Sequence, residues 1–222
     1  MHYLRDVLRL DVGAAIALFN GTDGEWRGRI AELGRHRAVL SVTQQTRPPE
    51  AATDLWLLFA PLKRARLDWL VEKATELGVS VLWPVRTAHT QAERLNMERL
   101  RRQVIEAAEQ SERLTLPELR PPERLVRVLA GWPEKRHLLV CDETGAGEPA
   151  AVVAARRAGA PLAVLIGPEG GFAETELDPM GKLAFVSRIG LGPRVLRAET
   201  AALAALAVVQ AVAGDWRRSP RR

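Results

Sequence analysis

The chain has 222 residues, 47% of them hydrophobic, so it can bury a sizeable core in one large domain or two unequal ones. Its single cysteine excludes an intrachain disulfide, and we find neither a signal peptide nor an apolar run long enough to cross a bilayer, so we expect a cytoplasmic protein with no membrane segment. The formal net charge of +5 comes mainly from arginine, which suits an RNA partner, although 27 interspersed acidic residues are equally consistent with a solvated surface.

The first part of the chain is predicted to form a small β-barrel or open sheet over residues 1–47. Its expected strands occupy residues 14–19, 26–33 and 37–42. The NGTDG sequence at residues 20–24 is typical of a tight turn between the first two strands. Pro48 and Pro49 then predict a linker over residues 48–53.

From residue 54 the pattern changes to short apolar strands that alternate with amphipathic helices. Strands are expected at residues 55–60, 79–85, 137–141, 161–166 and 185–191. Helices are expected at residues 64–77, from Asn96 to about Arg113, and at 199–212. This alternation predicts an α/β domain over residues 54–217, with a largely parallel sheet covered by helices, before a basic tail at 218–222.

A glycine-containing loop follows the expected strand that ends at Ile166, and residues 174–176 are expected to open a short helix after it. The sequence from Gly167 to Phe172 holds three glycines, which allow a ligand to approach the backbone closely. It lacks both the Gly-x-Gly-x-x-Gly dinucleotide fingerprint and the Gly-Lys-Ser/Thr of a phosphate loop. Taken alone, such a loop is more often a plain turn from strand to helix.

A second polar loop, from Leu191 to Ala201, follows the next expected strand. Arg194, Arg197 and Glu199 are its charged residues, and helix capping explains them as well as function does. Loops at the carboxyl ends of neighbouring parallel strands line a shared crevice, however, and ligands bind there. The two loops together therefore indicate a binding site.

Four sequence blocks resemble the RsmE family. They are the paired loops at 167–171 and 191–201, the segment at 73–79, and the segment at 106–113 leading to Pro117. The start, from His2 to Phe19, is also similar. The resemblance implies a trefoil-knotted SPOUT methyltransferase domain behind a PUA-like β-barrel that binds RNA. It further implies S-adenosyl-L-methionine (SAM) as cofactor and methylation of N3 of a specific uridine in 16S ribosomal RNA of the small subunit, near the decoding centre.

The resemblance also assigns site residues. The residues implied in SAM binding are Leu139, Leu165, Ile166, Gly167, Glu169, Gly170, Gly171, Leu191, Gly192, Val195, Leu196 and Arg197. Those implied in RNA binding are Arg5, Arg9, Lys63, Arg64 and Arg66. Family likeness implies a homodimer. One cysteine and four scattered histidines offer no ligand spacing, so no metal is expected.

Methyl transfer to N3 of uridine requires the loss of a weakly acidic imide proton, and a nearby cation stabilises the resulting anion. We expect Arg197, with Arg194, to supply that cation, while Glu199 orients the arginine or accepts the proton. Glu169 is a second acidic candidate. Two alternatives stay open: a different SPOUT RNA methyltransferase that acts on another base or a ribose 2′-hydroxyl, and a non-catalytic RNA-binding assembly factor.

Overall fold

The computed structural model describes residues 3–51, 53–91 and 94–217. The chain forms two compact units. The first contains the residues up to Ala51 together with the short segment Glu112–Thr115, and the second contains the rest of the described chain. The basic tail predicted at 218–222 lies outside the described residues.

The first unit is a three-stranded antiparallel sheet in the order β1–β2–β3. After a short π-helical segment (η1, Tyr3–Val7), the strands are β1 (Ala15–Phe19), β2 (Glu25–Leu33) and β3 (Ala38–Arg47). The predicted turn is present: the Asn20 side-chain oxygen accepts hydrogen bonds from the backbone N–H groups of Thr22 and Asp23, at 3.0 and 2.9 Å. Ile30, on β2, is fully buried, and β3 continues five residues beyond the predicted strand.

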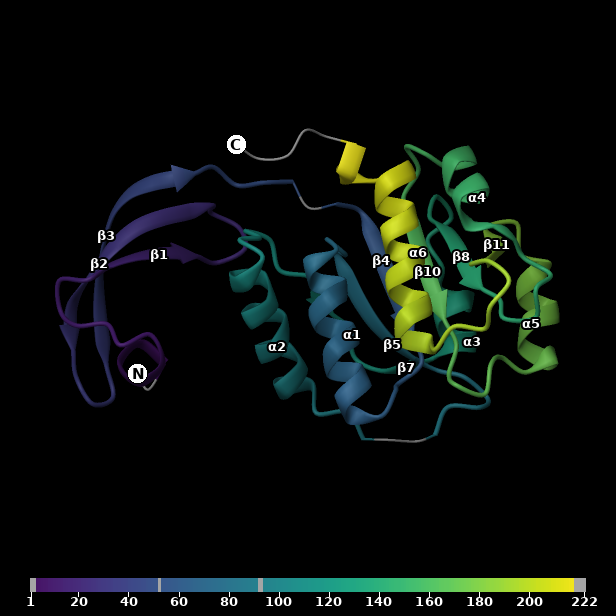
Figure 1. The fold of residues 1–222 in the computed structure, drawn as a ribbon, viewed down its shortest axis with the longest axis horizontal. Coiled ribbons are helices and arrows are strands. Elements are labelled where there is room, and N and C mark those ends of the chain that lie inside the picture. The colour runs from purple at the N-terminus through teal and green to yellow at the C-terminus, as the bar shows by residue number, and fades with distance from the viewer. Residues whose placement is uncertain (1–2, 52, 92–93, 218–222) are drawn as a thin grey trace. The chain divides into compact units, whose positions relative to one another are not determined.

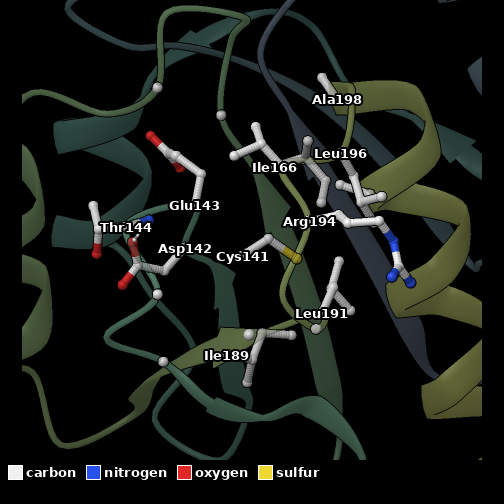
Figure 2. A pocket seen from close by; sticks show the side chains of 18 of the residues that line it. Cys141, Asp142, Glu143, Thr144, Ile166, Ile189, Leu191, Arg194, Leu196 and Ala198 are labelled. Carbon is white, nitrogen blue, oxygen red and sulfur yellow. Dashed lines mark hydrogen bonds between the residues drawn. The ribbon is translucent and has the colours of Figure 1, made fainter.

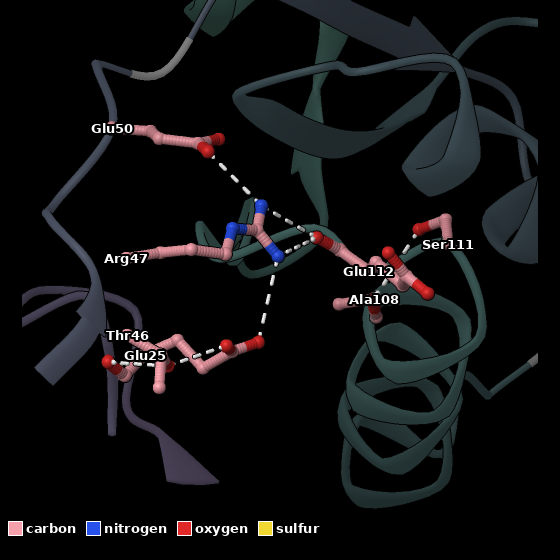
Figure 3. A network of polar contacts seen from close by, with 7 residues as sticks. All are labelled: Glu25, Thr46, Arg47, Glu50, Ala108, Ser111 and Glu112. Atoms are coloured by element: carbon pink, nitrogen blue, oxygen red, sulfur yellow. Dashed lines mark hydrogen bonds and ion pairs between the residues drawn. The ribbon is translucent and has the colours of Figure 1, made fainter. Parts of the chain in front are cut away.

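Arg47, the last residue of β3, contacts three separate segments of the first unit (Figure 3). Its guanidinium lies 3.5 Å from the Glu25 carboxylate and 3.0 Å from that of Glu50. Both terminal nitrogens also donate to the backbone carbonyl of Glu112, each at 3.1 Å. One side chain therefore joins β2, the segment after β3 and the 112–115 segment.

The second unit is built on an eight-stranded parallel sheet in the order β6–β5–β4–β10–β8–β11–β9, with β7 paired to β5 (Figure 1). The strands are β4 (Leu55–Phe59), β5 (Val81–Arg86), β6 (Glu118–Leu119), β7 (Glu123–Arg124), β8 (His137–Cys141), β9 (Glu148–Pro149), β10 (Leu162–Ile166) and β11 (Val186–Gly190). Pro84 is tolerated in β5 because it falls between the residues that pair with β6 and those that pair with β7.

Helices cover both faces of this sheet. They are α1 (Arg64–Glu76), α2 (Met97–Gln110), α3 (Leu125–Ala130), α4 (Ala150–Arg156), α5 (Glu174–Gly181) and α6 (Ala198–Val212), followed by the 3₁₀ turn η2 (Asp215–Arg217). Successive strand residues point to opposite faces, so Val164 packs in the core under α1, α2, α4 and α6, while Leu165 packs in the core under α3 and α5. Burial on both faces explains the unbroken apolar runs. The predicted α/β architecture is confirmed.

Two helices were not predicted, and one helix is shorter than predicted. α3 and α4 have only six and seven residues, too few for a periodic pattern to stand out. α2 ends at Gln110 rather than near Arg113, because Ser111 caps it and Glu112 adopts a positive φ of 52°. Among the described helices, none is long and apolar enough to cross a membrane.

We predict that Arg47→Ala lowers the free energy of unfolding of the first unit by about 1–2 kcal/mol, because the substitution removes two ion pairs and two hydrogen bonds to Glu112. Hydrogen exchange of the amides in β2 and β3 measures the effect. Arg37→Ala is the matched control, since Arg37 is 78% exposed and lies 3.9 Å from Glu32. Equal exchange rates in the two variants would show that Arg47 contributes no more to the stability of the first unit than Arg37 does.

Candidate functional site

A pocket of about 690 Å³ opens at the carboxyl ends of β8, β10 and β11 (Figure 2). Because these strands are parallel neighbours, the loops that follow them meet at one edge of the sheet. The lining residues are Cys141, Asp142, Glu143, Thr144, Gly145, Gly147 and Pro149 at and after the end of β8, Ile166, Gly167, Pro168, Glu169 and Gly171 at and after the end of β10, and residues 189–198 with Ala201 at and after the end of β11.

The third loop crosses the pocket because of the chain's route. β11 lies beyond β8 at the far side of the sheet, yet α6, which follows it, packs against α1, α4 and β10. The segment from Leu191 to Arg197 must therefore return over the ends of β8 and β10 (Figure 1). It forms one wall of the pocket as it does so.

Glycines let the three loops approach closely. Gly171 has a φ of +68°, and a Cβ there would lie 1.9 Å from the Glu143 side-chain oxygen. A Cβ on Gly147 would lie 2.5 Å from the backbone carbon of Ile189. A larger residue at position 147 would push the loop after β8 away from the backbone of β11, whereas one at position 171 would be disfavoured by the positive φ and would displace the Glu143 side chain.

Asp142 anchors the wall that follows β8. Its carboxylate is fully buried and accepts hydrogen bonds from the Arg188 guanidinium, at 2.7 Å from Nε, and from the backbone N–H of Thr144, at 2.9 Å. Burial by itself raises the pKa of this carboxyl group, but the hydrogen bonds from Thr144 and Arg188 outweigh it, so the pKa lies below its usual value. Asp142 is therefore held as a carboxylate.

Cys141, at the end of β8, lines the pocket as a neutral thiol. Burial, reinforced by the nearby Glu143 and Asp142 carboxylates, raises its pKa to about 12. The side chain consequently contributes an apolar surface rather than a nucleophile.

Arg66, in the first turn of α1, links two loops at the rim. Its guanidinium lies 3.3 Å from the Glu169 carboxylate and 3.5 Å from Oε1 of Glu199. Glu199 begins α6, its side chain is 13% exposed, and its second oxygen, Oε2, is buried without a hydrogen-bond partner among the described residues. Glu199 itself does not line the pocket, whereas its neighbours Arg197 and Ala198 do.

The two long walls of the pocket differ in charge. Figure 2 shows Asp142, Glu143 and Thr144 on one side and Arg194 with Leu196 on the other. Arg194 and Arg197 are both exposed. The pocket can thus hold a ligand between a carboxylate-bearing wall and an arginine-bearing wall.

The structure brings most of the predicted cofactor residues to this pocket. The lining contains Ile166, Gly167, Glu169, Gly171, Leu191, Gly192, Val195, Leu196 and Arg197, together with the predicted catalytic Arg194. Leu139 and Leu165 lie beneath it, fully buried in the two cores. Gly170 faces His89, whose Nδ1 lies 3.1 Å from the carbonyls of Gly170 and Gly171.

Sequence reasoning did not single out Glu143, Thr144, Gly145 or Gly147. The signal that could have found them is the same as for the other two loops: an apolar strand followed by a short loop with glycines. Of the predicted RNA-binding residues, Lys63 and Arg64 are exposed at the start of α1, while Arg66 is engaged by Glu169 and Glu199.

The other two predicted RNA-binding residues, Arg5 and Arg9, belong to the first unit. Arg5 donates to the carbonyls of Leu33 and Gly34, both at 3.1 Å, and Arg9 is exposed. Across the described ranges, no group of three or more His, Cys, Asp or Glu side chains is placed to hold a metal ion.

Comparison with known proteins identifies relatives of the whole chain. A family model described as an RNA methyltransferase domain matches residues 49–210, and one described as an RNA methyltransferase PUA domain matches residues 1–43. The chain is 34% identical over 212 residues to ribosomal RNA small subunit methyltransferase E of Rickettsia conorii, covering 95% of this chain and 86% of that protein. It is 26% identical to the Bacillus subtilis protein of the same name, covering 94% and 86%.

Solved structures of two methyltransferases have the same fold as this chain. Ribosomal RNA small subunit methyltransferase E from Neisseria gonorrhoeae, bound to S-adenosyl methionine, superimposes with a TM-score of 0.86 at 29% identity, covering 96% of this chain and 90% of that one. A methyltransferase from Legionella pneumophila in complex with the bound cofactor SAM gives a TM-score of 0.82 at 28% identity, covering 95% and 88%.

We predict that Asp142→Asn lowers the free energy of unfolding by about 2 kcal/mol at pH 7, because it removes the charge that Arg188 neutralises. Since the folded pKa lies below the ordinary 3.8, this stabilisation is complete above that value and is lost as the pH falls through the folded pKa. Urea unfolding at pH 7 and pH 3 should thus show a smaller difference at pH 3. The exposed Asp178→Asn is the control, and a difference independent of pH would contradict the assignment.

We also predict that Cys141 reacts with iodoacetamide at pH 8 at least about 100-fold more slowly than a free cysteine of pKa near 8.5, because its pKa of about 12 leaves little thiolate. Mass spectrometry of the intact folded protein follows the reaction. Alkylation should become fast in urea, and fast alkylation of the folded chain would rule out the raised pKa.

Proposed function

Since this chain belongs to the RsmE family of RNA methyltransferases, we propose that it transfers a methyl group from SAM to N3 of one uridine in 16S ribosomal RNA, near the decoding centre of the small subunit. The observation that carries the proposal is the pocket at the ends of β8, β10 and β11, with a carboxylate-bearing wall on one side and two arginines on the other. Both comparison structures with bound SAM share this fold.

The pocket suits SAM chemically. SAM has no phosphate groups, and this pocket has no phosphate-loop sequence, whereas main-chain groups around Gly167, Leu191 and Gly192 are open to an adenine ring. The Gly171 and Gly147 positions, where a Cβ would clash, keep those loops close together. When bound, SAM supplies a methyl group on a positively charged sulfur. Ile166, Leu191 and Leu196 provide apolar surface for it.

The protein's own task is to make N3 of uracil nucleophilic. Arg197, with Arg194, provides positive charge that stabilises the uracil anion and so lowers the pKa of its imide. Glu199 lies in the first turn of α6, directly after Arg197 and Ala198, and its Oε1 is held by Arg66. In this proposal Glu199 orients the arginine or accepts the N3 proton; its buried Oε2 has no partner in the described part of the chain.

The proposed function also assigns roles to the domains of the chain. We assign residues 1–47 to RNA binding by the PUA-like domain, which the family match to residues 1–43 supports, residues 48–53 to a linker, and residues 54–217 to the methyltransferase domain. Arg5, Arg9 and Lys63 remain proposed RNA contacts. We propose a homodimer that acts in the cytoplasm on RNA within the small ribosomal subunit.

The test is to map methylated nucleosides. Small subunits purified from cells lacking this enzyme are incubated with the full chain and SAM, and the RNA is digested and examined by mass spectrometry. We expect 3-methyluridine at one position. A 2′-O-methylated nucleoside or another methylated base would assign a different reaction. SAM binding detected by calorimetry, with no methylation, would indicate a non-catalytic binding protein.

We predict that Arg197→Ala lowers kcat by about 10²–10³-fold while the Kd for SAM, measured by calorimetry, changes by no more than a few-fold, since the cation acts on the developing anion. Glu199→Gln is expected to move the pH–rate profile, which a purely structural role would leave in place. Arg156→Ala, an exposed arginine on α4 outside the pocket, is the control. Unchanged turnover in Arg197→Ala would remove this side chain from the mechanism.

A further inference from the structure

A second, smaller pocket of about 240 Å³ lies where α1 and α2 begin. It shares no lining residue with the pocket at the ends of β8, β10 and β11. Its lining consists of Arg64, Leu67, Arg94, Leu95, Asn96 and Arg99. Half of these residues are arginines and none is acidic. We call this group the arginine pocket.

Among the described residues, one of the three arginines in the arginine pocket is paired with an acidic side chain. Arg99 is held by both carboxylate oxygens of Asp68. Arg64 and Arg94 are exposed, and within the described ranges no ion pair with an acidic side chain is found for either. Two guanidinium groups without an acidic partner in the described part of the chain therefore line one small concavity, with Leu67 and Leu95 as its apolar part. The positive charge of such a site attracts an anion. The concave, partly apolar lining also removes part of the anion's surface from water, which strengthens the attraction.

Two helix starts add to this preference. α1 has 13 residues and no side chain caps its start at Arg64. α2 has 14 residues and begins beside Asn96, whose side-chain oxygen accepts from the backbone N–H of Arg99 at 3.0 Å. Unbonded N–H groups of a first helical turn carry partial positive charge. The helix starts and the arginines therefore favour the same kind of ligand.

The first turn of α1 joins the arginine pocket to the proposed uridine site. Arg64 lines the arginine pocket, and Arg66, two residues later, contacts Glu169 and Glu199 at the rim of the larger pocket. Residues two apart on a helix point to opposite sides of a cylinder about 10 Å across. A polynucleotide with one base in the larger pocket would thus have backbone phosphates within reach of Arg64.

We propose that the arginine pocket binds a backbone phosphate of the RNA substrate close to the target uridine. This inference rests on the proposed function. Guanidinium forks match phosphate oxygens with two parallel hydrogen bonds, which the exposed Arg64 and Arg94 can both provide. The contact fixes where the strand lies and reads no base, so the pocket sets position rather than sequence.

The experiment compares wild type with the double variant Arg64→Gln/Arg94→Gln. Binding of SAM-loaded full-length protein to small subunits that lack the modification is measured at several salt concentrations. We expect the Kd to rise about tenfold and the slope of log K against log salt to fall by about 0.7–0.9, as for one lost phosphate contact. The loss should appear in KM for the subunit, with Kd for SAM unchanged.

The double variant Arg101→Gln/Arg102→Gln is the matched control, because both are exposed arginines on α2 outside the arginine pocket and the same number of charges is removed. An equal loss in that variant would mean a general positive field and would overturn the proposal. Unchanged affinity and slope in the double variant would overturn it as well. Circular dichroism of each variant verifies that it is folded.

Two further readouts separate the remaining explanations. Titration with inorganic phosphate alone asks whether the pocket takes small anions; phosphate binding that the double variant loses, with subunit affinity unchanged, would make it a small-anion site and refute an RNA contact. Methylation by wild type is measured in parallel. If wild type forms no 3-methyluridine, the proposed function fails; if it does, and the double variant binds as tightly, only the phosphate contact fails.

Discussion

The return of the chain from β11 to α6 is the constraint on which the site depends. α6 packs beside α1 and β10, two strand positions back from β11, so residues 191–197 must cross the ends of β8 and β10. The apolar face of α6, with Ala202, Leu206 and Val209 in the core, holds that crossing in place. The pocket wall is therefore stabilised by hydrophobic burial outside the site, and the loop residues are left free for the ligand.

Burial decides which charged side chains near this crossing are available to a ligand. Asp142 is fully buried and neutralised by Arg188, so it shapes the β8 loop and is not free to pair with a ligand. Glu143, next along the chain, is exposed and lies against Gly171. Arg194 and Arg197 stand on the other wall. A cationic methyl donor and an anionic nucleobase could thus each meet the opposite charge within one pocket.

The start of α1 connects the two proposed ligand sites. Arg66 contacts both Glu169, in the loop after β10, and Glu199, at the start of α6, while Arg64 belongs to the arginine pocket. Helix α1 is fixed to the sheet by Leu67, Leu70 and Val71, all buried. A rigid helix with arginines on two sides can hold an RNA strand at a set distance from the methyl donor, which is what orientation of reactants requires.

The sequence by itself determined the longer strands, the long helices and the two glycine loops, because unbroken apolar runs and turn residues report burial and backbone conformation locally. The strands β6, β7 and β9 have two residues each, too few to show such a pattern. It also carried the family resemblance, since the loops at 167–171 and 191–201 combine backbone requirements with charged residues. Only the tertiary structure decided which residues meet: the loop from Asp142 to Gly147 joins the pocket, Leu139 and Leu165 lie beneath it, and Arg66 pairs with Glu169 and Glu199. Strand order and helix packing set these contacts, and neither is written in any local stretch of the chain.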